Sequence, residues 1–377
     1  MRIVHLTRDF PPNARGGLSS AVGEWVRACR SCGVDNRVLS FDDWRPAKGA
    51  PRRANTGLAE TTAGLFRVRH AGDLTEAAQW LASTKASILH VHDPLLWEFA
   101  QAASLESASK KVFTCHVVHS YMNRLRGVAA STRSSRDESR AMSEADLVTV
   151  PSRAALDIVR RLYPDAHERI TELGFGFTPD RRETWAYPKE NGTRRILYVG
   201  RFDSLKGTED WFSCIASIAR RCPEIQFDIV GGLPGNPRGE KRWLKRWGIT
   251  WGTILGERIR FHGWLPHQAL QEQFGQASLL VAPSHFESWG LVPLEAYPFG
   301  IPMILANNPA YRENLEGAEQ IFWFEPGNRE QLLSQIWTVL GKTSSLHQQR
   351  KPVGLVKSHR SWRERGRETV ALYRSLL

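Results

Sequence analysis

Two glutamates in the stretch Val281–Pro302 have the type and spacing to bind a ligand rich in hydroxyl groups. The stretch begins as an apolar strand end, crosses a polar loop and is predicted to enter a helix at Pro293, because proline suits the first helical position. Glu287 falls in the loop and Glu295 in the first helical turn, with seven residues between them. Gly290 lets the backbone approach a ligand closely, and free amides at a helix start favour an anion. A ligand with both a phosphate and sugar hydroxyls fits this pattern; the positive end of a helix dipole explains the two glutamates equally well.

Two cations follow the predicted strand 196–199 directly. Arg201 and Lys206 are five residues apart around a turn. In doubly wound folds, ligands bind at the carboxyl ends of strands. The two side chains could therefore reach a diphosphate and neutralise the charge that develops when a sugar leaves a nucleotide. The alternative is a solvated basic loop.

The first half of the chain offers a glycine pair and several histidines. Gly16 and Gly17 follow the predicted strand 2–6, where their amides could contact a phosphate, shape an acceptor pocket or form a plain turn. A histidine at a strand end is more often a satisfied polar group than a catalyst. The histidines near predicted strand ends in this half are His90, His92, His116 and His119. No His-Glu-x-x-His or cysteine-rich metal pattern occurs in the chain.

Length and charge limit the classes of protein that the sequence fits. The 377 residues suffice for two domains, and five cysteines are too few for a disulfide framework. The net charge of +12 is spread along the chain, with an excess of five basic residues in 1–190 and seven in the remainder. Without a nucleic-acid motif, this favours anionic substrates or an anionic membrane surface over nucleic acid. The first residues lack the apolar core of a signal peptide, and no run is long enough to span a membrane, so we expect a cytoplasmic protein, soluble or peripheral.

Strands alternate with helices in both halves of the chain, which predicts α/β domains with parallel sheets covered on both faces. The polar stretch 178–195, rich in charged residues with proline and glycine, is predicted to be a linker. The predicted strands are 2–6, 37–39, 66–68, 88–92, 112–114 and 147–150 before it, and 196–199, 226–230, 259–261, 279–282 and 302–305 after it.

The stretch from Glu287 to Pro302 resembles the acidic signature of the retaining glycosyltransferases of family 4. Its two glutamates with seven residues between them are followed by Ala296, Gly300 and Pro302, as in that signature. The sequence GRFDSLKG, residues 200–207, resembles the Gly-Arg…Lys-Gly diphosphate motif of the same family.

Two positions depart from the family pattern. Ser288 and Trp289 stand where Gly-Phe is usual after the first glutamate. Pro298 falls inside the predicted helix and removes a backbone hydrogen bond to Leu294, which predicts a short or kinked helix.

The resemblance implies a GT-B fold, in which two Rossmann-like domains face each other across a cleft. The first domain would be 1–177 and would take the acceptor, and the second would be 196–361 and would hold the donor. The final helix, 362–377, would cross back onto the first domain.

The resemblance also implies a role for each site residue. Glu295 would hold the ribose hydroxyls, and Glu287 those of the donor sugar. Arg201 and Lys206 would hold the diphosphate, and His116 would contact the sugar near the reacting carbon. The catalytic set is thus His116, Arg201, Lys206 and Glu287. The implied donor-binding set is Gly17, Arg201, Lys206, Glu287, Ser288, Trp289, Gly290, Leu291 and Glu295.

The implied activity is that of a retaining hexosyltransferase in polysaccharide or glycoconjugate synthesis. It would move a sugar from a nucleotide-diphosphate sugar to a hydroxyl of a glycan, glycolipid or small molecule. The chain has no Asp-x-Asp motif to hold a divalent metal, so we expect neither a metal nor another cofactor. The alternatives are an epimerase or phosphorylase on the same scaffold, or a non-catalytic basic binding protein.

The segment Arg238–Trp247 combines five basic residues with two tryptophans four residues apart. On a helix, Trp243 and Trp247 would share a face flanked by cations, which could anchor the chain at a membrane interface. We favour the alternative, a surface helix that buries both indoles on its own domain.

Overall fold

The computed structural model divides the chain into two compact units, Met1–Thr178 with Arg360–Leu377, and Pro179–His359. The predicted linker up to residue 193 and the basic segment 42–63 lie outside the described residues. The structure describes residues 1–8, 10–11, 17–41, 64–68, 74–104, 108–128, 132–177, 194–233, 236–251, 256–341 and 360–377.

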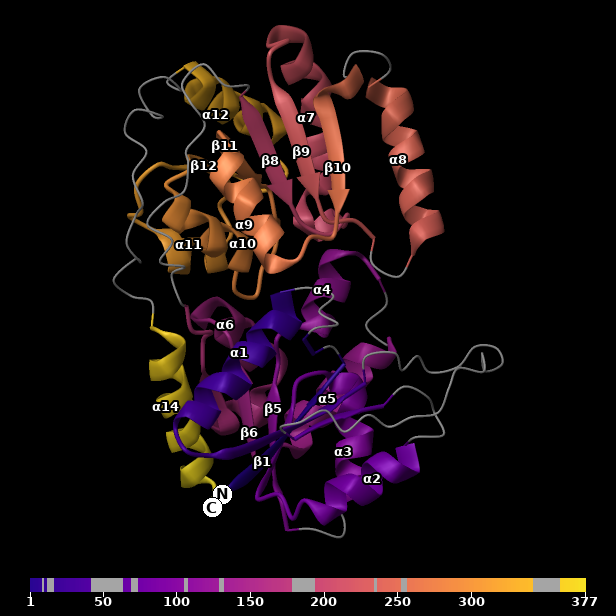
Figure 1. Cartoon of the computed structure of the whole chain (residues 1–377), viewed down its shortest axis with the longest axis vertical. Coiled ribbons are helices and arrows are strands. Elements are labelled where there is room, and N and C mark those ends of the chain that lie inside the picture. The colour runs from indigo at the N-terminus through magenta and orange to yellow at the C-terminus, as the bar shows by residue number, and fades with distance from the viewer. Residues whose placement is uncertain are drawn as a thin grey trace. The chain divides into compact units, whose positions relative to one another are not determined.

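The described strands of the first unit form one parallel sheet in the order β3-β2-β1-β4-β5-β6-β7 (Figure 1). The order reverses beside β1, which is the arrangement of a doubly wound Rossmann-like domain. The strands are β1 (Arg2–Thr7), β2 (Asp35–Ser40), β3 (Leu65–Arg67), β4 (Ile88–Val91), β5 (Lys110–Thr114), β6 (Leu147–Val150) and β7 (Ile170–Glu172).

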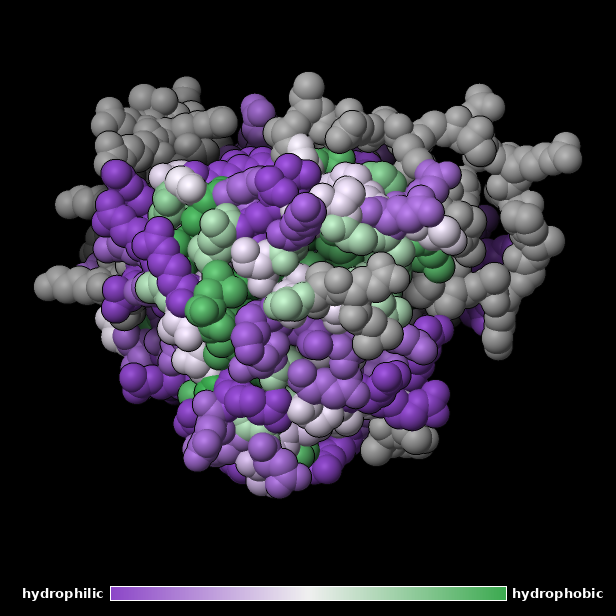
Figure 2. Space-filling view, turned by 90° about the horizontal axis from the view of Figure 1, so that it is seen from below, coloured by the Kyte–Doolittle hydropathy of each residue, from purple (hydrophilic) through white to green (hydrophobic). Residues whose placement is uncertain are grey.

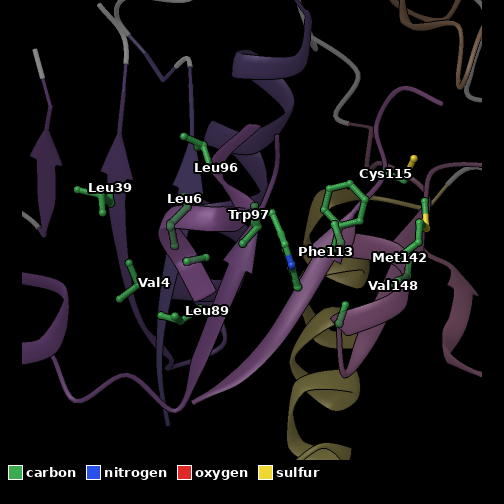
Figure 3. Packing of buried hydrophobic residues seen from close by; sticks show 14 of the residues in the cluster. Val4, Leu6, Leu39, Leu89, Leu96, Trp97, Phe113, Cys115, Met142 and Val148 are labelled. Carbon is green, nitrogen blue, oxygen red and sulfur yellow. The ribbon is translucent and has the colours of Figure 1, made fainter. Parts of the chain in front are cut away.

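Helices cover this sheet, and apolar side chains from strands and helices fill the space between them. Figure 3 shows part of this core, in which the rings of Trp97 and Phe113 meet edge to face with centroids 6.1 Å apart. The helices are α1 (Gly17–Ser31), α2 (Leu74–Ser83), α3 (Trp97–Ser104), α4 (His119–Leu125), α5 (Arg133–Glu144) and α6 (Arg153–Leu162).

The final helix α14 (Trp362–Ser375) belongs to the first unit, as the resemblance implied. It packs closely on α1, since a Cβ on Gly366 would lie 2.7 Å from the carbonyl oxygen of Ala28 (Figure 1). The buried indole of Trp25 donates a 3.0 Å hydrogen bond to Thr369 Oγ1. Packing and a buried hydrogen bond together hold the end of the chain on the first unit.

The second unit is another doubly wound domain, with strand order β10-β9-β8-β11-β12-β13, all pairs parallel. Its strands are β8 (Arg195–Val199), β9 (Gln226–Val230), β10 (Ile259–Gly263), β11 (Leu279–Ala282), β12 (Met303–Ala306) and β13 (Ile321–Phe324). Its described helices are α7 (Thr208–Arg221), α8 (Pro237–Trp251), α9 (His267–Gln276), α10 (Leu291–Ala296), α11 (Pro309–Leu315) and α12 (Arg329–Gly341). β8 begins at Arg195, one residue inside the predicted linker.

Helix α8 turns its tryptophans into the core of the second unit. The Trp243 ring stacks on Phe202 at a centroid distance of 4.5 Å, and Trp247 meets Phe212 at 5.6 Å. Both indoles therefore pack within their own domain, which is the alternative that we favoured from the sequence. They do not form the aromatic part of a membrane anchor. Among the described helices, none has the length and apolar character to cross a bilayer. Figure 2 shows one face of the molecule, where hydrophilic residues predominate and hydrophobic residues form small groups.

Candidate functional site

The loop after β8 is built to lie against the loop after β11. The Asp203 side chain accepts a 2.9 Å hydrogen bond from Leu205 N and caps a short 3₁₀ turn that ends at Lys206. Gly207 then adopts a left-handed conformation (φ 62°), and a Cβ there would lie 2.0 Å from the carbonyl oxygen of Pro283. Only glycine fits, because both the conformation and the contact exclude a side chain. The Lys-Gly end of the Gly-Arg…Lys-Gly motif thus brings the two strand ends together.

The helix after β11 begins earlier than predicted. Gly290, in a left-handed conformation (φ 88°), precedes α10, which starts at Leu291 rather than Pro293. Pro293 is tolerated at the third position because the first amides of a helix have no partner within it. Glu295 is consequently the fifth helical residue and not in the first turn. Pro298 ends the α-helix as predicted, and a 3₁₀ turn, Tyr297–Phe299, replaces its last part.

Lys206 and Glu287 meet in an ion pair at these two strand ends, with Nζ 2.7 Å from Oε1. The Tyr311 hydroxyl also donates to Glu287 Oε1 at 3.2 Å and lies 3.2 Å from Ser284 Oγ. Burial raises the pKa of Tyr311, so this residue remains a hydroxyl donor. The Glu287 side chain is 14% exposed and that of Lys206 27%, so the pair can be reached by a ligand. The resemblance implies that Lys206 binds the diphosphate of a donor and Glu287 its sugar, but in the structure the two side chains bind each other.

Arg201 lies in the loop after β8 and Glu295 on α10. Within the described part of the chain, the exposed Arg201 side chain and the half-buried Glu295 carboxylate make neither an ion pair nor a side-chain hydrogen bond. Desolvation by the surrounding protein raises the pKa of Glu295 from 4.5 to about 7. An unpaired carboxylate in such surroundings is costly, and a ligand that donates hydrogen bonds to it would relieve that cost.

The other predicted donor contacts lie on the same loop. The Trp289 ring is buried, and its carbonyl accepts a 2.6 Å hydrogen bond from Asn314 Nδ2. Ser288 and Leu291 are half-buried beside it. The role of their backbone amides toward a ligand stays a prediction.

Replacing Gly290 by alanine is expected to destabilise the fold. The added Cβ would lie 2.6 Å from the Tyr311 ring, at a φ of 88° that disfavours any side chain. We expect a loss of about 1–3 kcal/mol in the free energy of unfolding, measured by denaturant titration. Gly317→Ala is the matched control, because its φ is 75° and nothing lies within 4 Å of an added Cβ. Equal losses in both variants would show that the Tyr311 contact does not constrain the loop.

The remaining predicted residues belong to the first unit. Gly17 is exposed at the start of α1, and Gly16 lies outside the described residues. His116 follows β5, and burial lowers its pKa to about 3. His116 therefore stays a neutral imidazole at physiological pH, which disfavours a general-base role. His119 lies apart at the start of α4, where its amide donates to Glu138 Oε2.

Two family models match consecutive parts of the chain. The model described as Glycosyltransferase Family 4 matches residues 15–181, and the model described as Glycosyl transferases group 1 matches residues 180–355. The chain is a family 4 glycosyltransferase. It is an enzyme that transfers sugars, as the acidic signature and the Gly-Arg…Lys-Gly motif implied.

This glycosyltransferase has distant relatives along most of its length. It is 26% identical over 335 residues to "Glycogen synthase" of Mycobacterium tuberculosis strain H37Rv, covering 81% of this chain and 78% of the relative. It is 24% identical to "D-inositol 3-phosphate glycosyltransferase" of Frankia alni, with 77% of each chain covered.

Solved structures show the same GT-B fold. A sucrose-phosphate synthase from Thermosynechococcus elongatus superposes with a TM-score of 0.75 at 19% identity, covering 100% of this chain and 99% of that one. Anabaena HepE, solved in complex with UDP and glucose, superposes with a TM-score of 0.71 at 16% identity, with both chains fully covered.

No sequence pattern indicated the residues that support the loop after β11, between Pro283 and Gly290. Asp210 on α7 accepts hydrogen bonds from His285 at 2.6 Å and Arg329 at 2.8 Å, which connects this loop to α7 and to the start of α12. Asn308, buried at the start of α11, donates to the Ser284 carbonyl at 2.9 Å. Asn308 and Tyr311 come just after β12, so the rule that sites gather at strand carboxyl ends could have found them.

Proposed function

We propose that this enzyme moves a sugar from a nucleoside-diphosphate sugar to an acceptor hydroxyl, with retention at the anomeric carbon and without a metal ion. The observation that carries the proposal is the Lys206–Glu287 ion pair, formed between the loops after β8 and β11. The loop after β8 also carries Arg201, and α10 carries Glu295. Two cations and two carboxylates match a diphosphate attached to two sugars. Retention rests on the family resemblance alone.

Arg201 and Lys206 would neutralise the diphosphate as it leaves. Arg201 is exposed, and Lys206 sits at the end of the capped 3₁₀ turn that fixes its backbone. Preorganised cations of this kind stabilise charge that develops in the transition state, because they need not reorganise during the reaction. With no Asp-x-Asp motif in the chain, these side chains take the place of a metal in the proposal.

Glu287 would orient Lys206 and accept hydroxyls of the donor sugar. Its Oε1 already receives Lys206 and Tyr311, which leaves the second carboxylate oxygen for a ligand. Glu295 would receive the ribose hydroxyls, and its lack of a partner in the described chain is what this role requires.

Donor binding is expected to strengthen as the pH rises from about 5.5 to about 7.5. Free Glu295, with its pKa near 7, is largely protonated below that pH. Ribose hydroxyls favour the ionised carboxylate, so its pKa falls in the complex and a proton is released on binding. Calorimetry in buffers of different ionisation enthalpy measures this release. Glu295→Gln should abolish the release, whereas a variant that still releases the proton would contradict the role of Glu295.

The raised pKa of Glu295 also predicts how the stability of the free enzyme depends on pH. A carboxyl whose pKa is raised on folding binds its proton more tightly in the folded state, so stability falls as the pH rises from about 4.5 to about 7. Glu295→Gln removes this penalty. The melting temperature of the variant relative to wild type should therefore rise between pH 5 and pH 8.

A thermal-shift screen of nucleotide sugars tests the proposed function. A true donor at 100 times its dissociation constant should add about 2.7 kcal/mol to the free energy of unfolding. Nucleoside monophosphates, which lack the second phosphate, serve as controls. If no nucleotide sugar raises the melting temperature above these controls, the donor assignment is wrong.

A further inference from the structure

Four histidines of the first unit form a buried cluster, and the family resemblance implies a role for only one of them, His116. His5 on β1 is paired in register with His90 on β4, and His92 and His116 follow β4 and β5. The His5 and His92 rings stack with centroids 5.3 Å apart, and those of His92 and His116 with centroids 5.2 Å apart. Burial lowers the pKa of every one of them, so the rings are neutral and each carries one proton.

The first link of a hydrogen-bond chain fixes the proton of His5. Asn36 Nδ2 donates to the Val34 carbonyl at 3.1 Å, so the oxygen Oδ1 is the atom that faces His5 Nε2 at 2.8 Å. An amide oxygen only accepts, and His5 Nε2 must therefore carry the proton. His5 Nδ1 is left with a lone pair.

The same reasoning fixes the ring protons of His92 and His116. His5 Nδ1 lies 3.0 Å from His92 Nε2, which must donate, and His92 Nδ1 lies 2.9 Å from His116 Nε2, which must donate in turn. The tautomers are thus set by the partners' chemistry, starting from one asparagine. His116 Nδ1 is left as an unprotonated acceptor. It is buried and has no hydrogen-bond partner among the residues that the structure describes.

An unpaired buried acceptor costs about 1–3 kcal/mol, which a bound ligand can recover by donating a hydrogen bond. Stacking on Phe175, with ring centroids 5.5 Å apart and planes 7° from parallel, holds the His116 ring in place. The indole of Trp25 meets the same ring edge to face. The ring thus has a fixed orientation as well as a fixed tautomer.

We propose that Asn36, His5 and His92 are positioning residues that set the tautomer of His116 and leave its Nδ1 lone pair as the acceptor for a ligand hydroxyl. The proposal rests on the proposed function, because the family resemblance implies that His116 contacts the transferred sugar. The hydrogen-bond chain ends at the side-chain amide of Asn36, which cannot take up a proton. His116 therefore selects for a hydroxyl group and does not store the proton of the reaction.

A metal site is the competing explanation, since ring nitrogens of His5, His90 and His92 lie within 4.8 Å of one another. Each ring nitrogen of these residues already has a protein partner. His90 binds Thr114 through Nε2 and Tyr373 through Nδ1, and the other two belong to the chain described above. Hydrogen bonds thus account for all six nitrogens.

The test is long-range ¹H–¹⁵N NMR of the ¹⁵N-histidine-labelled full chain without ligand, with metal analysis of the same sample. We expect His116 to carry its proton on Nε2 and to have a bare Nδ1. His92→Asn keeps an oxygen acceptor facing His116 and should retain this tautomer, whereas His92→Leu should populate the other one. A protonated Nδ1 in the wild type, an unchanged tautomer in His92→Leu, or about one metal ion per chain would overturn the proposal.

Kinetics separate this inference from the proposed function. With the nucleotide sugar that stabilises the chain most, His92→Leu should lose about tenfold in kcat/KM, and His92→Asn should stay within about threefold. Equal losses in the two variants would reduce His92 to a packing role. If no nucleotide sugar binds the wild type, the proposed function fails while the NMR result still decides the tautomer.

Discussion

Replacing Lys206 by alanine is expected to lower kcat about 10²–10³-fold. Lys206 is the cation nearest to Glu287 at the end of β8, and in the proposed mechanism it meets the charge of the departing diphosphate. Loss of one preorganised group of this kind typically costs that much in rate. Steady-state release of nucleoside diphosphate from the bound donor measures the effect.

Lys241→Ala is the matched control, since it removes the same charge from an exposed position on α8. It should leave kcat unchanged. Wild-type turnover by Lys206→Ala would contradict the role of Lys206. A loss that added magnesium or manganese restores would show that a metal can do what the lysine was proposed to do.

Replacing Glu287 by alanine is expected to lower kcat/KM about ten- to over a hundredfold while leaving the fold intact. The change removes a charge-assisted hydrogen bond, worth about 1.5–3 kcal/mol, and releases Lys206 from its 2.7 Å contact. Because the two side chains are partners, the Lys206→Ala/Glu287→Ala double variant should lose less than the product of the single effects. Glu272→Ala, an exposed glutamate on α9, is the control.

Multiplying effects in the double variant would mean that Glu287 and Lys206 act on separate parts of the donor, as the sequence alone suggested. Wild-type kcat/KM in Glu287→Ala would remove this residue from the site. The wild type, the two single variants and the double variant together distinguish these outcomes.

The central strands of both sheets could be predicted from sequence because apolar residues fill most of their buried positions. β1, β8 and β11 lie within one residue of their predicted bounds. The edge strands β7 and β13 were not predicted. β7 has only three residues, and the four apolar residues of β13, IFWF, do not alternate with polar ones, so their pattern does not distinguish a strand from a helix.

The site was predicted residue by residue, but its pairings were not. Nothing in the spacing of Lys206 and Glu287 indicates an ion pair, because it depends on how closely Gly207 lets two loops approach. The sequence predicts the start of α10 two residues late, because proline favours the first helical position. The left-handed conformation of Gly290, which precedes the helix, is seen only in the structure. His5 was overlooked because one histidine in an apolar strand carries no signal until its neighbour, His90, is known from the register.

The most direct test of the account is nucleoside-diphosphate release from UDP-, ADP- and GDP-sugars by chain treated with excess EDTA. The wild type is compared with the Lys206→Ala/Glu287→Ala double variant. The account predicts that one donor class releases nucleoside diphosphate at a rate that EDTA barely changes, and that the double variant falls to background. The account is contradicted if no donor is cleaved faster by the wild type than by the double variant, or if EDTA abolishes release and magnesium or manganese restores it.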